Sequence, residues 1–204
     1  MTGALELLLL DFDGVLAQYS RPKRFSRLAQ IAGCSPTQVE EVLFGSGLEV
    51  AYDSGKIDTA GYLRQLGEGL GAYVGETDWV DARVAACEVD PRLLEMVTYA
   101  AERVPIAVLT NNGPLMKQAI TQIVPSLFPA LVGRVLCSAE FGGRKPQTQV
   151  YAAALARLEA RAATTLFVDD LFFNVRGARA AGLHADTVAG APSLRRVLKR
   201  YALA

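Results

Sequence analysis

The chain has few of the residues that mark several common kinds of site. Its 204 residues include three cysteines, which are far apart and show no spacing typical of a metal site or a disulfide framework. This usage is typical of a reducing cytosol, and we expect Cys34, Cys87 and Cys137 to be small buried residues. The single histidine, His184, lies near a late predicted strand, where we expect a structural role.

The sequence also lacks an excess of charge and any long hydrophobic run. Lys plus Arg and Asp plus Glu both number 21, so the net charge gives no reason to expect nucleic acid or an anionic membrane as a partner. The start of the chain lacks basic residues, and the run Leu7 to Leu10 is too short for a signal peptide or a membrane span. These absences predict a cytoplasmic protein with no nucleic-acid or membrane partner.

Strand and helix patterns alternate along most of the chain, and hydrophobic residues, at 51%, are numerous enough for a sizeable core. Strands are predicted at residues 5–10, 104–109, 135–137, 165–168 and 184–188. Helices are predicted at 115–124, 150–158 and 175–181, with further helices starting at Asp90-Pro91 and Ser193. Such alternation forms a parallel sheet through right-handed crossovers, with helices on both faces.

Residues 18–88 interrupt this alternation with a helical pattern. Ser35-Pro36 and Asp58 are good helix starts, and Thr77 or Asp78 is expected to cap a third helix. A block inserted directly after the first strand would lie above the carboxyl ends of the strands, where a lid belongs. We therefore predict an α/β protein with a sheet core at 1–17 and 89–204 and a helical insertion at 18–88.

The most informative motif is the stretch Asp11-Phe12-Asp13-Gly14-Val15-Leu16. It follows four leucines that predict a buried strand, and ligands of parallel α/β sheets collect at the carboxyl ends of the strands. Side chains two apart in a strand face the same way, so Asp11 and Asp13 need a cation, a shared proton or a lysine to offset their repulsion. An aspartate beside Mg²⁺ can attack phosphorus, whereas the alternative reading is an ordinary turn.

Three further polar clusters follow predicted strands. Thr110 to Gly113 offers a hydroxyl and backbone amides to an anion, although Asn-Gly is also a common turn. Lys145 lies in a glycine-containing loop without P-loop spacing, and a solvated lysine is the alternative. Asp169-Asp170 ends another buried strand, with Asn174 four residues beyond, and its charge needs compensation.

Together these clusters predict a single site for phosphoryl chemistry. Carboxylates at two strand ends supply the hard oxygen ligands that Mg²⁺ prefers. Thr110 and the neighbouring amides can donate to a phosphoryl group. Lys145 can neutralise both the phosphate and the nucleophile.

With these motifs in this order, the chain resembles the haloacid dehalogenase (HAD) superfamily of phosphohydrolases over nearly its whole length. The matching stretches are Asp11 to Leu16, Leu109 to Asn112, Arg144 to Pro146, and Phe167 to Asp170 with Asn174-Val175. The resemblance implies a Rossmann-like core with a small helical cap inserted after the first motif.

The resemblance also implies a role for each residue of the site. Asp11 would be the nucleophile that becomes an aspartyl phosphate, and Asp13 the general acid and base. Thr110 and the Asn111 amide would hold the phosphate, while Lys145 would orient the phosphate and Asp11. Mg²⁺ would be bound by Asp11, Asp13 (through its backbone carbonyl) and Asp170, with Asp169 and Asn174 in support.

Two stretches depart from the family or bear on the substrate. Gln147-Thr148 stands where the family commonly has Asp-Pro, which we expect to change a helix start rather than the chemistry. The stretch Tyr52 to Ile57 looks like the cap of the family's sugar-phosphate phosphatases, a loose likeness that fixes no substrate.

The sequence thus predicts a Mg²⁺-dependent phosphatase of a small phosphorylated metabolite, with sugar phosphates among the candidates, as a monomer or homodimer. A phosphomutase on the same fold and a non-catalytic phospho-ligand sensor are the alternatives. Receiver-type sensors, however, are shorter and lack a helical insertion. The resemblance disfavours a dehalogenase, since family dehalogenases lack the second acid that Asp13 supplies.

Other conspicuous residues are expected to be structural. The basic run Arg21-Pro22-Lys23-Arg24 is predicted to be a solvated helix start rather than part of the site. Trp79, the only tryptophan, is predicted to pack inside the helical block. Phe172 and Phe173, just after the second acidic pair, are predicted to pack in the core.

Overall fold

The computed structural model describes residues 5–204, so the predictions that concern residues 1–4 lie outside the described residues. The strands are β1 (Leu7–Leu10), β2 (Gln18–Tyr19), β3 (Cys87–Glu88), β4 (Ile106–Thr110), β5 (Val135–Cys137), β6 (Thr165–Asp169) and β7 (His184–Thr187). The α-helices are α1 (Arg21–Ala32), α2 (Pro36–Glu40), α3 (Leu48–Asp53), α4 (Thr59–Leu70), α5 (Glu76–Ala85), α6 (Pro91–Ala101), α7 (Met116–Ile123), α8 (Thr148–Arg157), α9 (Phe172–Ala180) and α10 (Gly190–Arg200). Short turns of other helix types are η1 (Glu41–Gly45, a π-helix) and the 3₁₀ turns η2 (Pro125–Leu127), η3 (Ser138–Phe141) and η4 (Ala162–Thr164).

The predicted parallel sheet is confirmed, and within residues 5–204 it has five strands in the order β5-β4-β1-β6-β7. β1 lies at the centre, where Leu8 pairs with Ile106 of β4 and with Leu166 of β6. The four leucines of β1 are buried because strands cover both edges and helices cover both faces. β4 begins later than predicted, at Ile106, since Pro105 has no N–H to give to a strand ladder.

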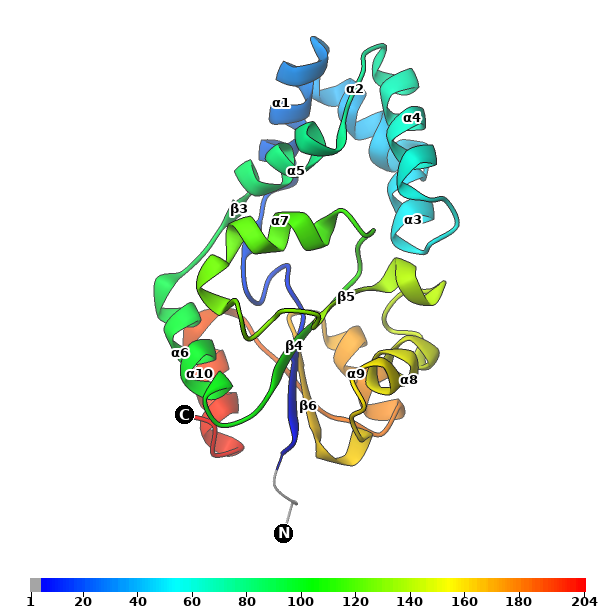
Figure 1. The fold of residues 1–204 in the computed structure, drawn as a ribbon. Coiled ribbons are helices and arrows are strands. Elements are labelled where there is room, and N and C mark those ends of the chain that lie inside the picture. The colour runs from blue at the N-terminus through cyan, green and yellow to red at the C-terminus, as the bar shows by residue number, and fades with distance from the viewer. Residues whose placement is uncertain (1–4) are drawn as a thin grey trace.

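Alternate side chains of the sheet point into two different helical layers. Leu8 and Leu10 pack in the core that includes α6, α7 and α10, whereas Leu7 and Leu9 pack with α8 and α9. Figure 1 shows α6 and α10 on one side of the strands and α8 and α9 on the other. The predicted Rossmann-like α/β fold, with helices on both faces, is confirmed.

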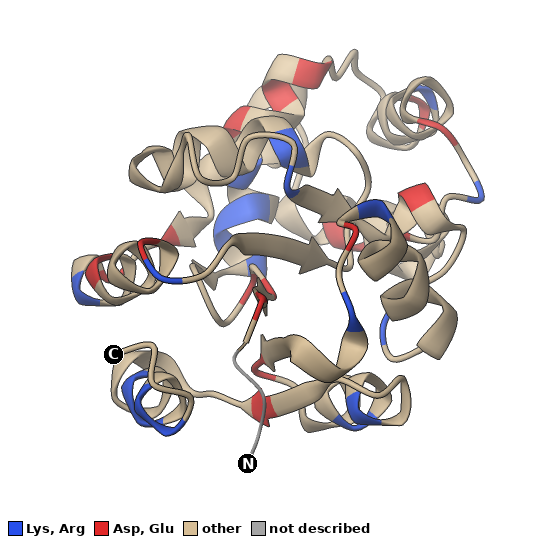
Figure 2. Ribbon diagram, turned by 60° about the horizontal axis from the view of Figure 1, so that its bottom comes forward, with Lys and Arg blue, Asp and Glu red and all other residues tan. Residues whose placement is uncertain are grey.

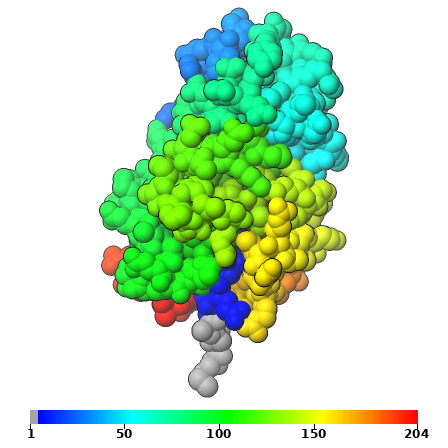
Figure 3. Space-filling view, viewed as in Figure 1, coloured from blue at the N-terminus to red at the C-terminus, as the bar shows by residue number. Residues whose placement is uncertain are grey.

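Residues 18–88, here called the helical segment, leave and rejoin the sheet through two adjacent strands. β2 and β3 pair antiparallel, with Gln18 opposite Glu88 and Tyr19 opposite Cys87. Between them, α1 to α5 and η1 form the body at the top of Figure 1 and Figure 3, beyond the end toward which β1 runs. The predicted limits fall on this strand pair, and the division into a core and an inserted domain stays a prediction.

Some helix starts are where the sequence places them and others are displaced. The predicted N-caps at Ser35, Asp58 and Asp90 are confirmed. The N-cap predicted at Thr77 or Asp78 is wrong, because Gly75 caps α5 and the Asp78 carboxylate accepts from the Gly75 N–H at 2.9 Å. Ser193 likewise lies inside α10 and accepts from the Ala189 N–H at 2.6 Å. In both helices the polar side chain lies inside the helix and accepts a hydrogen bond from the backbone N–H of the N-cap residue.

Charged residues of both signs are spread over the visible helices in Figure 2, with basic residues prominent on α10. No helix in residues 5–204 is long and apolar enough to cross a membrane.

Candidate active site

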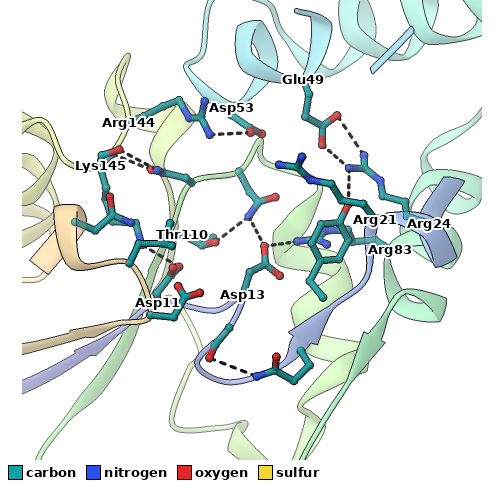
Figure 4. Close-up of a pocket in the computed structure, with 18 of the residues that line it drawn as sticks. Asp11, Asp13, Arg21, Arg24, Glu49, Asp53, Arg83, Thr110, Arg144 and Lys145 are labelled. Atoms are coloured by element: carbon teal, nitrogen blue, oxygen red, sulfur yellow. Dashed lines mark hydrogen bonds and ion pairs between the residues drawn. The ribbon is translucent and has the colours of Figure 1, made fainter. Parts of the chain in front are cut away.

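A cavity of about 540 Å³ lies between the carboxyl ends of the central strands and the helical segment (Figure 4). Residues that follow β1, β4 and β6 line one side of it, and residues of α1, α3 and α5 line the other. This volume is suited to a small molecule. Both parts of the chain therefore contribute side chains to one site.

Asp11 lies at the tip of β1 and is held by both backbone and side-chain contacts. Its N–H donates to the Val168 carbonyl at 2.8 Å, and its Oδ1 accepts from the Phe12 N–H at 2.7 Å. The same oxygen lies 2.9 Å from Lys145 Nζ. Burial raises the pKa of Asp11 well above its usual range, an effect that Lys145 opposes and Asp169 reinforces. A bound cation would favour the ionised form of this carboxyl.

Lys145 connects the acidic residues at the ends of two strands. Its buried ammonium lies 2.9 Å from Asp11 and 2.7 Å from Asp169. Burial alone would lower the pKa of Lys145, but the two carboxylates outweigh it and raise the pKa. The Asn111 side chain fixes the lysine backbone, accepting from the Lys145 N–H at 2.8 Å and donating to its carbonyl at 3.0 Å.

Asp169 is fully buried, and its oxygens are occupied by protein donors. Oδ2 accepts from Lys145 at 2.7 Å, and Oδ1 accepts from the Leu171 N–H at 2.8 Å. The Asn174 amide lies 3.0 Å from both oxygens. Asp169 and Asn174 therefore position Lys145, which leaves Asp169 little capacity to bind anything else.

Asp170 lies against the loop that follows Asp11. A Cβ atom on Gly14 would stand 2.3 Å from Asp170 Oδ2, and Gly14 has a φ of +81°, so only glycine suits this position. Burial, followed by the charge of Asp169, raises the pKa of Asp170. The carboxylate of Asp170 is thus brought next to the motif that begins at Asp11.

The carboxylates of Asp11, Asp169 and Asp170 fit a hard divalent cation. One oxygen from each lies within 4.8 Å of the others. Because Lys145 and its neighbours occupy Asp169, the oxygens left for a metal belong to Asp11 and Asp170. Two carboxylates in an oxygen-rich, partly open site are the ligands that Mg²⁺ commonly takes from protein. The assignment of the Asp13 backbone carbonyl as a further ligand stays a prediction.

The carboxylate of Asp13 points toward the helical segment (Figure 4). Its Oδ2 forms an ion pair with Arg83 of α5 and accepts from the Asn112 amide at 3.3 Å. Its Oδ1 is buried without a hydrogen-bond partner among residues 5–204. The same Asn112 amide donates to the Thr110 hydroxyl at 2.8 Å, so Asp13 and Thr110 are held by one side chain.

Most of the predicted site residues line one cavity, but the side chains of Asn111 and Asp169 bind other residues of the site. Asp11, Asp13, Thr110, Asn111, Lys145, Asp170 and Asn174 line it. The side chain of Asn111 holds the Lys145 loop, so any role in phosphate binding falls to its backbone amide. Asp169 lies beneath the cavity and acts on it through Lys145.

Sequence reasoning missed a buried network in the helical segment. Arg24 is paired with Glu49 and donates to the Tyr62 hydroxyl at 3.2 Å, while Trp79 Nε1 donates to the same hydroxyl at 3.0 Å. The predicted packing role of Trp79 is confirmed, since its side chain is buried here. Nothing in the spacing of these residues marks them, because they come from four different helices.

A second missed contact joins the helical segment to the Lys145 loop. The Asp53 carboxylate of α3 lies 3.6 Å from Arg144, and both residues line the cavity. Burial, reinforced by Glu49, raises the pKa of Asp53 well above its usual range, although Arg144 opposes the shift. The only sequence signal for this contact is the loose family likeness of the stretch Tyr52 to Ile57.

Two structural expectations are corrected. The basic run is not simply a solvated helix start, because Arg21 and Arg24 line the cavity and Arg24 is buried by its pairing with Glu49. Phe172 and Phe173 are not core residues: they are 61% and 48% exposed at the start of α9, and Phe173 lines the cavity.

The other expectations are met in part. His184 lies in β7, away from the cavity, with its ring 5.8 Å from that of Tyr201. Cys137 is buried, while Cys34 and Cys87 are only partly so.

The sequence model of the haloacid dehalogenase-like hydrolase family matches residues 5–182. No curated protein matches the chain by sequence.

Solved structures of similar proteins share the fold across nearly the whole chain. A HAD family enzyme from Bacteroides thetaiotaomicron, in complex with magnesium and inorganic phosphate, superposes with a TM-score of 0.74 at 20% identity, covering 92% of this chain and 96% of that one. A predicted HAD-like hydrolase from Porphyromonas gingivalis also gives 0.74, at 21% identity, with 97% and 99% covered. An L-2-haloacid dehalogenase from Xanthobacter autotrophicus gives 0.62 at 20% identity, with 98% and 84% covered. At these identities the likeness shows a common fold.

Proposed function

Because the chain belongs to the haloacid dehalogenase-like hydrolase family, we propose that it is a Mg²⁺-dependent phosphatase that hydrolyses a small phosphate monoester. The observation that carries this proposal is the buried cluster in which Lys145 bridges Asp11 and Asp169, with Asp170 alongside. Such a cluster offers a nucleophilic carboxylate, a fixed cation and room for a metal. The relative from Bacteroides thetaiotaomicron was crystallised with magnesium and inorganic phosphate, which supports the same chemistry on this fold.

In the first half of the proposed reaction, Asp11 attacks phosphorus. One of its carboxylate oxygens forms the new bond to phosphorus, and the other oxygen remains for Lys145 and the metal. The bond between phosphorus and the ester oxygen breaks, and Asp13, which must enter this step protonated and not as the ionised partner of Arg83, gives its proton to the departing alkoxide. Lys145 and Thr110 stabilise the negative charge on the phosphoryl oxygens.

In the second half, water hydrolyses the aspartyl phosphate. Asp13, now a carboxylate, takes a proton from the water as the water attacks phosphorus. The bond from phosphorus to Asp11 breaks, which releases inorganic phosphate and restores the Asp11 carboxylate. Asp13 thus serves as acid and then as base, a division of work that two neighbouring carboxyl groups permit.

Asp11 and Asp170 would hold Mg²⁺. When bound, the ion supplies positive charge next to the phosphoryl oxygens and screens the repulsion between substrate and carboxylates. The buried position of Asp11 makes this charge important, since burial raises its pKa and opposes ionisation.

The proposal is tested by phosphate release from p-nitrophenyl phosphate and a panel of phosphorylated metabolites, with Mg²⁺ or with EDTA. We expect release that requires Mg²⁺ and falls at least about a thousandfold in Asp11→Asn. Asp81→Asn, which removes an exposed carboxylate outside the cavity, is the matched control. Undiminished release by Asp11→Asn would contradict the nucleophile, and release unaffected by EDTA would contradict the metal requirement.

The same panel separates the alternatives. A phosphomutase would isomerise a sugar phosphate with little net release, and a sensor would bind phosphate without turnover. The cytoplasmic location and the monomeric or homodimeric state stay predictions.

A further inference from the structure

Arg83 is a buried cation that reaches from the helical segment into the proposed active site. It belongs to α5, and its side chain is 1% exposed. Its guanidinium lies 3.8 Å from the ring centroid of Tyr19 and forms an ion pair with Asp13 through Nη2. These two contacts fix the position of the guanidinium between the strand pair β2–β3 and the catalytic motif.

The contacts of Arg83 leave part of its hydrogen-bonding capacity unused. Nε and Nη1 are buried and have no hydrogen-bond partner in the described part of the chain. An arginine has five N–H donors, and buried donors are normally paired. Arg83 also lines the cavity, so a molecule bound there is the nearest candidate partner for these unpaired donors.

The neighbouring arginines are less suited to this role. Both terminal nitrogens of Arg24 are engaged by Glu49, Tyr19 and Tyr62. Arg21 is exposed and lies over the ring of Phe44, at 4.4 Å from its centroid. Arg83 is therefore the buried arginine whose donors are least satisfied within the helical segment as described.

The position of Arg83 determines which part of a substrate it can reach. Asp13 must approach the ester oxygen to within hydrogen-bond distance in order to protonate it. Arg83 contacts the same carboxylate, so it lies within roughly 8 Å of that ester oxygen, which is two hydrogen-bond lengths plus the width of the carboxylate. Lys145 and Thr110, to which the proposed reaction assigns the transferred phosphoryl group, lie on the other side of Asp13 from Arg83 (Figure 4). A group that binds Arg83 therefore belongs to the alcohol part of the ester.

We propose that Arg83 is a specificity-determining residue that binds a second anionic group, a carboxylate or a further phosphate, on the alcohol part of the substrate. This inference rests on the proposed phosphatase function and narrows it to phosphate monoesters with two anionic groups. The second anion would pair with the free donors of Arg83, which an uncharged alcohol does less well. Substrates that lack this anion would leave those donors buried and unpaired.

The test uses pairs of phosphate esters that differ in the second anion. Two pairs report on a carboxylate. Ethyl phosphate is compared with phosphoglycolate, and glycerol 3-phosphate is compared with 3-phosphoglycerate. Fructose 6-phosphate and fructose 1,6-bisphosphate report on a second phosphate. For one type of pair, we expect kcat/KM to be at least about tenfold higher for the member that carries the second anionic group.

Substitution of Arg83 should remove this preference. In Arg83→Gln we expect the ratio of the two kcat/KM values to fall about tenfold or more, and in Arg83→Lys we expect part of it to return. Arg21→Gln, which removes an exposed arginine of the same cavity, should keep the ratio. An equal fall in Arg21→Gln would indicate long-range charge attraction and would overturn the assignment to Arg83.

Binding measurements separate this inference from the proposed reaction. In Asp11→Asn, calorimetry should show that the ester with the second anionic group binds more tightly than its partner in the pair. Adding Arg83→Gln should remove this difference in affinity. Circular dichroism melting confirms that each variant is folded. If the wild-type enzyme hydrolyses both members of every pair equally well, the inference fails while the phosphatase function stands. If no ester is hydrolysed but the binding difference persists, the phosphatase function fails and the Arg83 site stands.

Discussion

The ring of Tyr52 occupies the space that a side chain on Gly113 would need. A Cβ atom at residue 113 would lie 2.1 Å from the nearest ring atom. The Tyr52 hydroxyl also accepts from the Leu115 N–H at 3.2 Å and lies 3.0 Å from the Thr59 hydroxyl. Tyr52 belongs to α3 and Gly113 follows β4, so this contact places the helical segment directly on the loop that is proposed to bind phosphate.

Gly113→Ala should destabilise the protein and lower its activity. The Tyr52 ring is fully buried and cannot move aside cheaply, so we expect a loss of about 1–3 kcal/mol in the free energy of unfolding. Chemical denaturation measures this loss, and KM for phosphate esters should rise. Gly33→Ala is a control for backbone strain without a steric neighbour, because a Cβ there meets no atom within 4 Å and Gly33 has a φ of +69°, a positive value that Gly113 does not share. A loss in Gly113→Ala no larger than the loss that strain alone causes in Gly33→Ala would show that the contact with Tyr52 costs little.

Gly14→Ala should weaken metal activation. The added methyl group would displace the Asp170 carboxylate, since its Cβ would lie 2.3 Å from Oδ2. Misplacement of a metal ligand commonly costs about 10–100-fold in metal affinity or activity. Titration of activity with Mg²⁺ should therefore show a higher half-saturating concentration. An unchanged Mg²⁺ curve would remove Asp170 from the metal site.

Asp13→Asn should harm poor leaving groups the most. General acid catalysis contributes about 10²–10⁴-fold, and an alkoxide needs the proton more than p-nitrophenolate does. We expect kcat/KM to fall further for glycerol 3-phosphate than for p-nitrophenyl phosphate. A uniform loss across leaving groups of different acidity would argue against the acid role.

Lys145→Met should reduce both stability and activity. The lysine is buried between Asp11 and Asp169, and removal of one partner from such a group typically costs about 3–5 kcal/mol. Phosphate release should fall as well, because the proposed mechanism also uses the lysine to stabilise the phosphoryl group. Lys23→Met, which breaks an exposed pair with Glu88, should change stability by about 1 kcal/mol or less. A Lys145→Met variant as stable as this control would show that the carboxylates of Asp11 and Asp169 do not depend on Lys145 to offset their charge.

Asp53→Asn should stabilise the protein at neutral pH. Burial raises the pKa of Asp53 in the folded state above its unfolded value, so ionisation of this carboxyl opposes folding. The penalty is absent below the unfolded pKa and grows as the pH rises through the folded pKa. The melting temperature of the variant should therefore exceed that of the wild type at neutral pH, and the difference should shrink in acid. A difference independent of pH would contradict this account, and the exposed Asp81→Asn controls for the loss of one negative charge.

The sheet and the acidic part of the site were predictable because both depend on local patterns. Four leucines followed by Asp11 mark a buried strand with a carboxylate at its tip, and parallel topology brings such tips together. Lys145 could be assigned to the same edge because its loop follows another strand of the sheet. These inferences need only strand order and direction.

The residues that the helical segment contributes to the cavity were not predictable in this way. Arg83 meets Asp13, 70 positions earlier in the chain, and Arg24 meets Glu49 on another helix. Helix periodicity indicates which face is buried but not which side chain of a distant helix it will meet. Phe172 and Phe173 show the opposite error, since apolar character alone suggested burial for residues that the start of α9 exposes.

The pairing of β2 with β3 also has a consequence for how the chain folds. The central strand β1 must find β4 far along the sequence, and such distant contacts are entropically costly and slow to form. The helices of residues 18–88 make more contacts with one another than with the rest of the chain. The two ends of this stretch lie side by side, where Gln18 pairs with Glu88. If this stretch folds first, the pairing of β2 with β3 brings its two ends together and shortens the effective loop between β1 and β4. The order of assembly would then run from the helices to the sheet, although the sheet carries the first strand of the chain.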